Sequence, residues 1–416
     1  MIFFRILNES LKQALHQLIG NKLRSFLTLL GIIIGVFCII AVLSAVDSLQ
    51  SNIVKSFQKL GTDVIYIDKF SWSEEPGKSF WKYMARPYPS QRDLEAIQSK
   101  SKLASKAALM VFIPGKMVKY LKNYVEGAYM LGITEEYNQV LKLDIEHGRY
   151  ISSLEFNHGA NQAILGFKLA EGLFPNEDGI GKEIKVYGQN FTVVGILKEE
   201  GNSIINIMQT DEAILVPLNS VKKLVNINSN SSWGSLIAVK AKAMDYMNEL
   251  KYELASILRP VRGLKPKDEE NFSSNQVTVL TNIIESVFGV VNLAGFAIGA
   301  FAMLVGAFGV ANIMFVSVKE RTSIIGVKMA IGAKRYFILL EYLFEAIILC
   351  IIGGIFGLVF VWLLLMILTK FLDFDLFVSW GNVWLGLGLS VAIGLIAGFL
   401  PALSASRMDP VEAIRR

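Results

Sequence analysis

The chain has 416 residues, of which 53% are hydrophobic, with a mean hydropathy of +0.45 and a net charge of +5. This composition excludes an ordinary soluble domain and predicts a membrane protein. Residues 1–46 carry four Lys and Arg against one acid, residues 47–286 carry 28 against 28, and the remainder carries nine against seven. Because the basic excess flanks apolar segments and forms no concentrated basic region, the charge gives no indication of nucleic-acid binding.

Four segments are apolar enough and long enough to span a bilayer, which takes about 20 residues. The predicted spans are residues 24–46, 287–318, 336–369 and 376–406. Residues 47–286, between the first two spans, have the composition of a soluble domain. Since Lys and Arg mark the cytoplasmic side, we expect cytoplasmic termini, a cytoplasmic tail at 407–416 and an exported domain at 47–286 of a cell-membrane protein.

The chain begins with an amphipathic stretch. Residues 1–22 place Phe4, Leu7, Leu11 and Leu15 on one helical stripe, which predicts a cytoplasmic helix lying on the membrane surface. Cleavage as a signal peptide is the alternative. We favour an uncleaved span because the apolar run that follows is longer than a signal core and a whole helix precedes it.

The exported region alternates strand and helix patterns. Residues 63–68 predict a strand, and Ser90 with Asp93 predicts a capping box that opens a helix. The aromatic stretch at 71–89 is interpreted as a self-packed loop, with contact to a partner or to lipid as the alternative. Short strands and turns dominate from 132 to about 210, and α/β patterns return afterwards. The sequence therefore predicts a β-rich part inserted into an α/β part.

Residues 287–318 contain no charge, and as a helix they would run about 48 Å, beyond a hydrocarbon core of about 30 Å. We therefore expect this span to continue outside the membrane as a stalk. Small residues recur along it and along the first span, which predicts close helix packing. The predicted packing residues are Gly31, Gly35, Gly295, Gly299, Gly306 and Gly309, with Ala302 in the same seam.

Catalytic motifs are missing from the sequence. It has no nucleotide-binding P-loop, nucleophile elbow or zincin motif, so no catalytic, cofactor-binding or metal-binding residues are predicted. His147 and His158, near acidic residues, could meet at a metal, but solvated turns are the default interpretation. Cys38 and Cys350 lie inside apolar spans and are interpreted as packing residues. The sequence therefore does not indicate an enzyme that acts alone.

The mid-sections of the spans hold no Asp, Glu, Lys or Arg, which argues against a hydrophilic pathway through them. Glu341 and Glu345 lie near the start of the third span, where we expect them to reach the interface or to pair with Lys334 or Arg335. Residues 319–335 carry five basic groups against the single acid Glu320. A short basic segment between spans is expected inside the cell, where a cytoplasmic partner could push on the membrane part.

At this basic segment the sequence closely resembles the MacB/FtsX-type permeases of ATP-binding-cassette systems. The resemblance is carried by Ser-Val-Lys-Glu-Arg-Thr at 317–322, Ile-Gly at 325–326, Lys-Met-Ala-Ile-Gly-Ala at 328–333 and Gly-Gly at 353–354. Further matches lie at 21–35, at 60–63 and 180–184 in the exported region, and at 408–415 in the tail. Each motif alone is weak, but all of them occur in order along essentially the whole chain.

The resemblance implies an α-helical membrane protein with four transmembrane helices and a large extracytoplasmic α+β domain, in which a porter-like α/β part holds an inserted β-rich part. It implies a homodimer that works with a separate cytoplasmic ATPase, which would bind ATP and Mg, while this chain would bind no cofactor. The basic segment would hold a coupling helix that receives the ATPase. The residues assigned to this coupling are Glu320, Arg321, Ile324, Ile325, Gly326, Lys328, Ala330, Gly332 and Ala333.

Two details of the coupling segment follow. The family commonly has Glu-Ile-Gly where this chain has Ile324, Ile325 and Gly326, so an acidic contact to the ATPase is missing or is replaced by an apolar contact of Ile324. We expect Gly326 and Gly332 to shape the turn into the third span.

The leading hypothesis for function is an export permease that transmits ATP-driven motion to the exported domain, with an outer-membrane channel and a periplasmic adaptor as further partners in some relatives. One alternative is a non-transporting relay that activates an envelope enzyme such as a cell-wall hydrolase. Another is extraction of lipoproteins from the membrane. The large exported domain favours transport, and no sequence feature names the substrate.

Overall fold

The computed structural model describes residues 22–74, 80–115, 117–175, 177–200, 210–227, 234–372 and 375–415. The predicted amphipathic helix at 1–22 lies outside these residues apart from its last position. The chain divides into two compact units, one formed by Met1–Asn52 with Glu285–Arg416 and the other by Ile53–Ile284. The first unit is helical, and the second contains the sheet.

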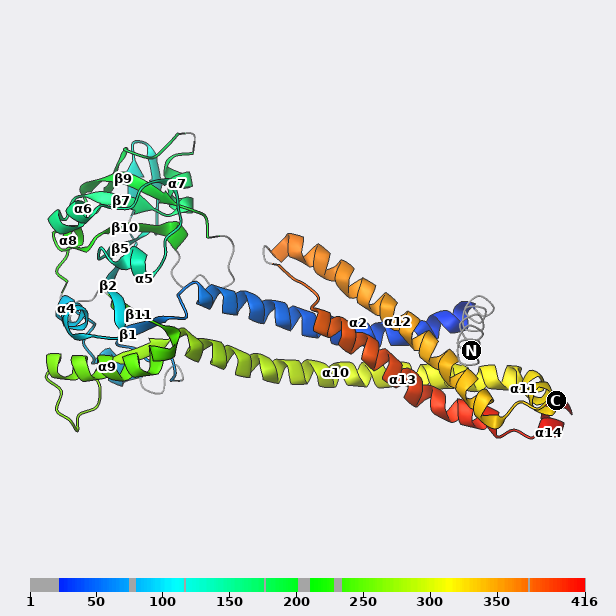
Figure 1. Cartoon of the computed structure of the whole chain (residues 1–416). Coiled ribbons are helices and arrows are strands. Elements are labelled where there is room, and N and C mark those ends of the chain that lie inside the picture. The colour runs from blue at the N-terminus through cyan, green and yellow to red at the C-terminus, as the bar shows by residue number, and fades with distance from the viewer. Residues whose placement is uncertain are drawn as a thin grey trace. The chain divides into compact units, whose positions relative to one another are not determined.

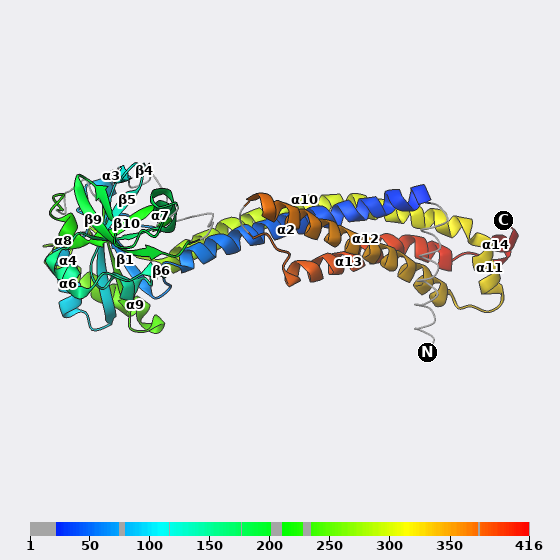
Figure 2. The same ribbon diagram turned by 90° about the horizontal axis from the view of Figure 1, so that it is seen from above.

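Within the described residues, four helices are long and apolar enough to cross a membrane, as predicted. They are α2 (Lys22–Gln58), α10 (Val277–Glu320), α12 (Arg335–Leu372) and α13 (Trp380–Ser406). Two short helices, α11 (Thr322–Ala330) and α14 (Pro410–Arg415), follow α10 and α13. The two ribbon views show the long helices of the helical unit lying along one another (Figure 1, Figure 2). Helix α10 starts earlier than the predicted 287, since the polar residues before the charge-free run do not break a helix.

Glycines of α10 and α2 allow close packing between these helices. A Cβ added to Gly299 would lie 1.9 Å from Cγ1 of Ile39, and one added to Gly306 would lie 2.9 Å from the carbonyl oxygen of Gly31. Gly35 faces Met303 at 3.1 Å in the same way, and Gly295 faces Val42 at 2.5 Å. No space remains for larger residues at these positions.

Gly309 is a correction to the predicted seam, because a Cβ built on it would meet no atom within 4 Å. The buried position next along α10 after Gly306 is Val310, which is 1% exposed. A spacing of four continues the face on which Gly299, Met303 and Gly306 lie, whereas a further step of three turns the residue away. Helical period therefore excludes Gly309 from the contact.

A second set of close-packed glycines was not among the predicted packing residues. On α12, Gly353 and Gly357 face Ile32 and Val36 of α2, and Gly354 faces Ser390 of α13. On α13, Gly394 approaches the backbone of Ile347, and Gly398 approaches Cβ of Ala346, both on α12. Helices α2, α12 and α13 thus pack at short distance through small residues, as membrane helices commonly do.

The sheet unit holds one mixed sheet with the strand order β12-β1-β11-β2-β5-β10-β7-β9-β8-β3-β4, and β6 pairs with β9. Its strands are β1 (Val64–Asp68), β2 (Ala104–Ile113), β3 (Val118–Tyr120), β4 (Asn123–Val125), β5 (Tyr129–Ile133), β6 (Ile145–Gly148), β7 (Gln162–Leu165), β8 (Glu183–Val186), β9 (Gln189–Leu197), β10 (Ala213–Pro217), β11 (Gly234–Ala241) and β12 (Ser273–Gln276). Strands β5 and β10, and β7 and β9, pair in parallel, and the remaining pairs are antiparallel.

The sheet continues across the boundaries that we expected for a β-rich insert at 132–210. Strand β5 pairs with β2 on one side and with β10 on the other, so the hydrogen-bonded sheet continues from one part into the other. Strands β3 and β4, which precede residue 132, pair with β8. A single cluster of buried hydrophobic residues extends from Ile65 to Phe272. The described residues of this unit therefore share one sheet and one core.

The helices of this unit are α3 (Phe80–Met84), α4 (Gln91–Lys100), α5 (Tyr137–Val140), α6 (Ser153–His158), α7 (Phe167–Leu173), α8 (Leu218–Val221) and α9 (Met247–Val261), with short 3₁₀ turns η1 (Thr210–Glu212) and η2 (Met244–Tyr246). The predicted capping box of α4 is confirmed, since Ser90 and Asp93 satisfy each other's backbone N–H groups. Asp93 also forms a buried ion pair with Arg262 at 2.9 Å, which fastens α4 to the end of α9.

The aromatic loop at 71–89 is partly packed on the sheet unit. The rings of Trp72 and Tyr66 are in contact, with their centroids 5.3 Å apart. Tyr83 is buried, and its ring centroid lies 6.1 Å from that of Phe70. Trp81 points to solvent and is 83% exposed. Its inner aromatic residues therefore follow the self-packed interpretation, whereas the rings of Phe80 and Trp81 are exposed.

Candidate coupling site

The segment between α10 and α12 folds as the helix α11 flanked by two breaks. Arg321 has non-helical dihedrals, φ −105° and ψ 15°, and separates α10 from α11. Gly332 has φ +99°, a conformation that side chains with a Cβ rarely adopt, and it turns the chain toward α12, which begins at Arg335. A short helix therefore lies at the turn between two spans, at the end of the helical unit where α14 is also found (Figure 2).

One face of α11 packs against α14. Ile325 and Gly326 are buried, and a Cβ added to Gly326 would lie 2.8 Å from Cβ of Ala413 and 3.1 Å from the backbone nitrogen of Ile414. We had expected Gly326 to shape the turn into the third span, and this expectation was wrong. It lies inside α11 and allows the C-terminal helix to approach, while the turn depends on Gly332.

Another face of α11 is apolar and exposed. Ile324, Val327 and Ile331 follow the spacing of three and four residues that places side chains on one helix face, and they are 55%, 49% and 81% exposed. Ala330 and Glu320 are also exposed, and Ala333 is half-buried. Within the described residues nothing covers this face of α11, which we call the apolar coupling face.

Two ion pairs connect α11 and its preceding break to α12. Nζ of Lys328 lies 2.6 Å from Oε1 of Glu341, and Nη1 of Arg321 lies 3.4 Å from Oε1 of Glu345. We had expected these acids to reach the interface or to pair with Lys334 or Arg335. Because Gly332 turns the chain between α11 and α12, Lys328 of α11 and Arg321 of the break before α11 both reach acids near the start of α12.

Glu345 is the most buried member of these pairs. Its side chain is 0% exposed, and its Oε2 has no hydrogen-bond partner among the described residues, whereas Arg321 is 24% exposed. A buried carboxylate of this kind depends strongly on its cation. Arg321 and Lys328, which we had assigned to contact with an ATPase, are therefore also attachments of α11 to the third span.

At the opposite end of the helical unit, polar side chains of α2 hold the connection between α12 and α13. Asn382 donates to Oδ2 of Asp47 at 2.9 Å and to Oγ of Ser44 at 3.2 Å. The hydroxyl of Ser48 accepts from the backbone N–H of Phe377 at 3.0 Å. This network was not predicted from the sequence, because the residues that it joins lie more than 300 positions apart.

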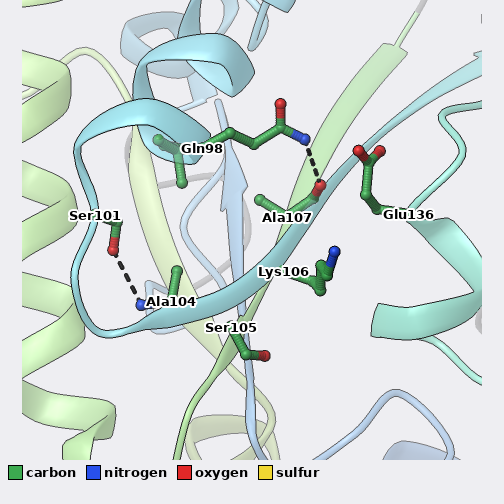
Figure 3. A pocket seen from close by; sticks show the side chains of 8 residues that line it. Gln98, Ser101, Ala104, Ser105, Lys106, Ala107 and Glu136 are labelled. Atoms are coloured by element: carbon green, nitrogen blue, oxygen red, sulfur yellow. Dashed lines mark hydrogen bonds between the residues drawn. The ribbon is translucent and has the colours of Figure 1, made fainter.

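The sheet unit carries a polar groove of about 300 Å³ beside the first half of β2. Figure 3 shows Gln98 reaching across from α4 to donate to the carbonyl oxygen of Ala107 at 3.1 Å, with Lys106 and Glu136 near the opening. Ser101 donates to a carboxylate oxygen of Glu253 and accepts from the backbone N–H of Ala104. The groove holds no arrangement of nucleophile and base.

Within the described residues, no three His, Cys, Asp or Glu side chains are grouped in a way that could hold a metal ion. His158 lies on the surface with Nδ1 2.8 Å from the carbonyl oxygen of Leu154. Glu155, the acid nearest to it in sequence, instead forms a two-bond ion pair with Arg149 at 2.7 and 2.8 Å. This pair and the N–H of Ser152 lower the pKa of Glu155 to about 2.

Comparison with known families accounts for nearly the whole chain. The family model of the MacB-like periplasmic core domain matches residues 25–257, and the model of the FtsX-like permease C-terminal region matches residues 296–410. The second match contains α11, both ion pairs to α12 and the start of α14.

Relatives show the same span of similarity. The uncharacterized ABC transporter permease YvrN of Bacillus subtilis is 30% identical over 409 residues, which cover 98% of this chain and 99% of YvrN. The macrolide export ATP-binding/permease protein MacB of Neisseria gonorrhoeae is 29% identical over 409 residues, again 98% of this chain. The present chain spans 60% of the length of that MacB protein.

Two solved structures resemble the sheet unit more distantly. The periplasmic region of MacB from Actinobacillus actinomycetemcomitans matches with a TM-score of 0.44 and 17% identity over 55% of this chain and 95% of that one. The extracellular domain of the transporter YknZ from Gram-positive bacteria matches with a TM-score of 0.39 and 20% identity over 51% of this chain and 98% of that one. On the two family models and the full-length match to YvrN, the chain belongs to the MacB/FtsX family of ABC transporter permeases.

Proposed function

We propose that this chain is the membrane subunit of an ABC exporter, and that it passes ATP-driven motion from a cytoplasmic ATPase on a partner chain to its exported domain. Two copies of the chain would form the membrane part, and ATP with Mg would be bound by the ATPase. The sequence itself contains no P-loop, so these residues would not bind the ATP themselves. The termini and α11 would face the cytoplasm, in agreement with the basic residues around α11.

The observation that carries this proposal is the apolar coupling face of α11. An exposed apolar helix face bordered by cations is typical of a surface that a protein partner covers. Ile324 stands on this face where relatives commonly have an acid, so an apolar contact would replace the acidic one. The ion pairs to Glu341 and Glu345 would then pass a displacement of α11 to α12.

The positions of ionisable side chains in the spans favour transmission of motion. They do not favour passage of a polar solute between the spans. The two acids of α12, Glu341 and Glu345, lie toward its α11 end and are held by cations. Buried ionisable groups near mid-membrane, which polar pathways commonly use, are missing from the sequence of the four spans. The substrate would therefore be handled by the exported domain.

The test uses the full chain, co-expressed with the ABC ATPase that co-purifies with it from native membranes. The chain alone is expected to hydrolyse no ATP, and Ile331→Asp is expected to abolish capture of the ATPase. Leu121→Asp, which changes an 86% exposed leucine of the sheet unit, is the matched control and should capture the ATPase normally. ATP hydrolysis by the chain alone, or normal capture by Ile331→Asp, would contradict the proposal.

The proteins that co-purify also separate export from its alternatives. A periplasmic adaptor and an outer-membrane channel support export, and macrolides, which the MacB relatives' name gives as their substrate, are the first compounds to test. A cell-wall hydrolase would instead indicate a relay that transports nothing. A lipoprotein carrier would indicate extraction of lipoproteins from the membrane.

A further inference from the structure

A groove of about 630 Å³ opens where α10 and α13 end and α11 and α14 begin. Ligand sites in proteins commonly have volumes of about 300–1,000 Å³, so this groove is large enough for the polar part of a lipid. Its apolar part includes Phe315, which is 45% exposed, and Val318, both in the last two turns of α10. Its polar part lies beyond the last residues of both long helices.

Four charged side chains line the polar part, two of each sign. Lys319 and Arg407 are the cations, Asp409 and Glu412 are the acids, and all four are exposed. None of them forms an ion pair with a described residue, although the neighbouring Arg321 and Lys328 both do. One oxygen of Asp409 accepts from the backbone N–H of Val411 at 2.8 Å, which holds this carboxylate at the groove. The groove thus presents both signs of charge toward whatever enters it.

The position of the groove restricts its ligand to an amphiphile. Helices α10 and α13 are both apolar enough to cross a membrane, so their ends mark the level at which hydrocarbon gives way to headgroups. An occupant would have its apolar part beside Phe315 and its polar part beside Lys319 and Arg407. Basic pockets between membrane helices on the cytoplasmic side bind lipid headgroups in this manner.

We propose that this groove is a binding site for a phospholipid whose headgroup carries both a phosphate and a primary ammonium, as in phosphatidylethanolamine. The cations Lys319 and Arg407 would donate charge-assisted hydrogen bonds to the phosphate oxygens. The ammonium N–H groups would in turn donate to the carboxylates of Asp409 and Glu412. A purely anionic headgroup would leave the two acids facing negative charge, so both signs are needed to match the groove. This site is separate from the apolar coupling face and does not depend on the proposed ATPase.

The experiment measures lipid retention by native mass spectrometry of the full chain purified in detergent. It is supplied with phosphatidylethanolamine, phosphatidylglycerol or phosphatidylcholine of identical acyl chains. We expect phosphatidylethanolamine to be retained best, because phosphatidylglycerol has no cation and the trimethylated nitrogen of phosphatidylcholine has no N–H to donate. Loss of one charge-assisted hydrogen bond should weaken retention about tenfold.

Two variants assign the contacts. Arg407→Ala should reduce retention of all three lipids, whereas Glu412→Gln, which keeps the shape of the side chain, should reduce only the preference for phosphatidylethanolamine. Lys334→Ala, which removes an exposed cation outside the groove, is the matched control and should retain lipid as the unaltered chain does. Equal helical circular dichroism and elution volume show that each variant is folded.

Three outcomes would overturn the proposal. Equal retention of the three lipids by the unaltered chain and by Arg407→Ala would mean that the groove has no specificity. Displacement of the lipid by millimolar inorganic phosphate alone would identify an anion site without a lipid. Unchanged lipid retention combined with lost ATPase capture in Arg407→Ala would assign the groove to the protein partner.

Discussion

Replacing Arg321 with methionine tests whether the pair with Glu345 stabilises the attachment of α11 to α12. The substitution removes the guanidinium and leaves a carboxylate that is 0% exposed without its cation. Breaking a buried ion pair from one side costs about 3–5 kcal/mol. Because Arg321 is 24% exposed and the N–O distance is 3.4 Å, we expect a loss near the lower limit, about 3 kcal/mol.

The Lys328–Glu341 pair is the matched control. Lys328 is 36% exposed, so Lys328→Met should lower stability by at most about 1 kcal/mol, as exposed ion pairs do. The double variant Arg321→Met with Glu345→Met should recover most of the lost stability, because apolar side chains of similar size often replace a buried pair without loss. Stability is measured by denaturant titration of the full chain in mild detergent, with helical circular dichroism as the signal.

Two results would refute a stabilising charge interaction between Arg321 and Glu345. Arg321→Met could be no less stable than Lys328→Met, which would mean that Glu345 does not rely on Arg321. Alternatively, the double variant could be as unstable as the single one, which would mean that Arg321 acts through packing instead of charge. ATPase coupling measured on the same variants then reports whether the attachment also transmits motion.

Three further predictions concern packing and charge elsewhere. Gly299→Ala should destabilise the helical unit by about 1–3 kcal/mol through overpacking, whereas Gly309→Ala, in open space, should leave the denaturation midpoint unchanged or raise it. Gly326→Ala should weaken coupling to the ATPase by displacing α14, and adding Ala413→Gly should restore it. Burial raises the pKa of Asp68 to about 6, so the folded state binds this proton more tightly than the unfolded state does. The contribution of Asp68 to stability is full below about pH 4 and is lost, by up to about 3 kcal/mol, as pH rises through 6. Asp68→Asn should remove this contribution in a pH series of denaturant titrations.

Much of the helical unit could be predicted because a bilayer imposes a strong pattern on sequence. Spans of apolar residues and the distribution of Lys and Arg located all four long helices. Gly299 and Gly306 were predicted to pack because a seam of small residues is visible along one helix. The pairing of these glycines with particular positions on α2, and the similar roles of Gly353 and Gly394, were not predicted, since a single sequence does not state which helix faces which.

The sheet was harder to predict because its pairings join distant segments. The strand at 162–165 has a clear pattern, yet its pairing partners lie at 213–217 and 189–197, one antiparallel and one parallel. Patterns of turns near residue 132 suggested a boundary between two parts. The pairing of β5 with both β2 and β10 carries the sheet across that boundary, and no local property of residues 129–133 reveals this pairing.

The coupling site shows where local sequence stops being informative. The basic segment indicated the position of α11, and the turn at Gly332 follows from the glycine itself. The partners of Glu341 and Glu345 were predicted from nearness in sequence, yet the turn at Gly332 pairs them with residues 13 and 24 positions away. That pairing also changes the interpretation of Arg321 and Lys328. Two of the five cations in this segment are instead fixed to the third span, so the surface that we propose for contact with an ATPase is the apolar coupling face of Ile324, Val327 and Ile331.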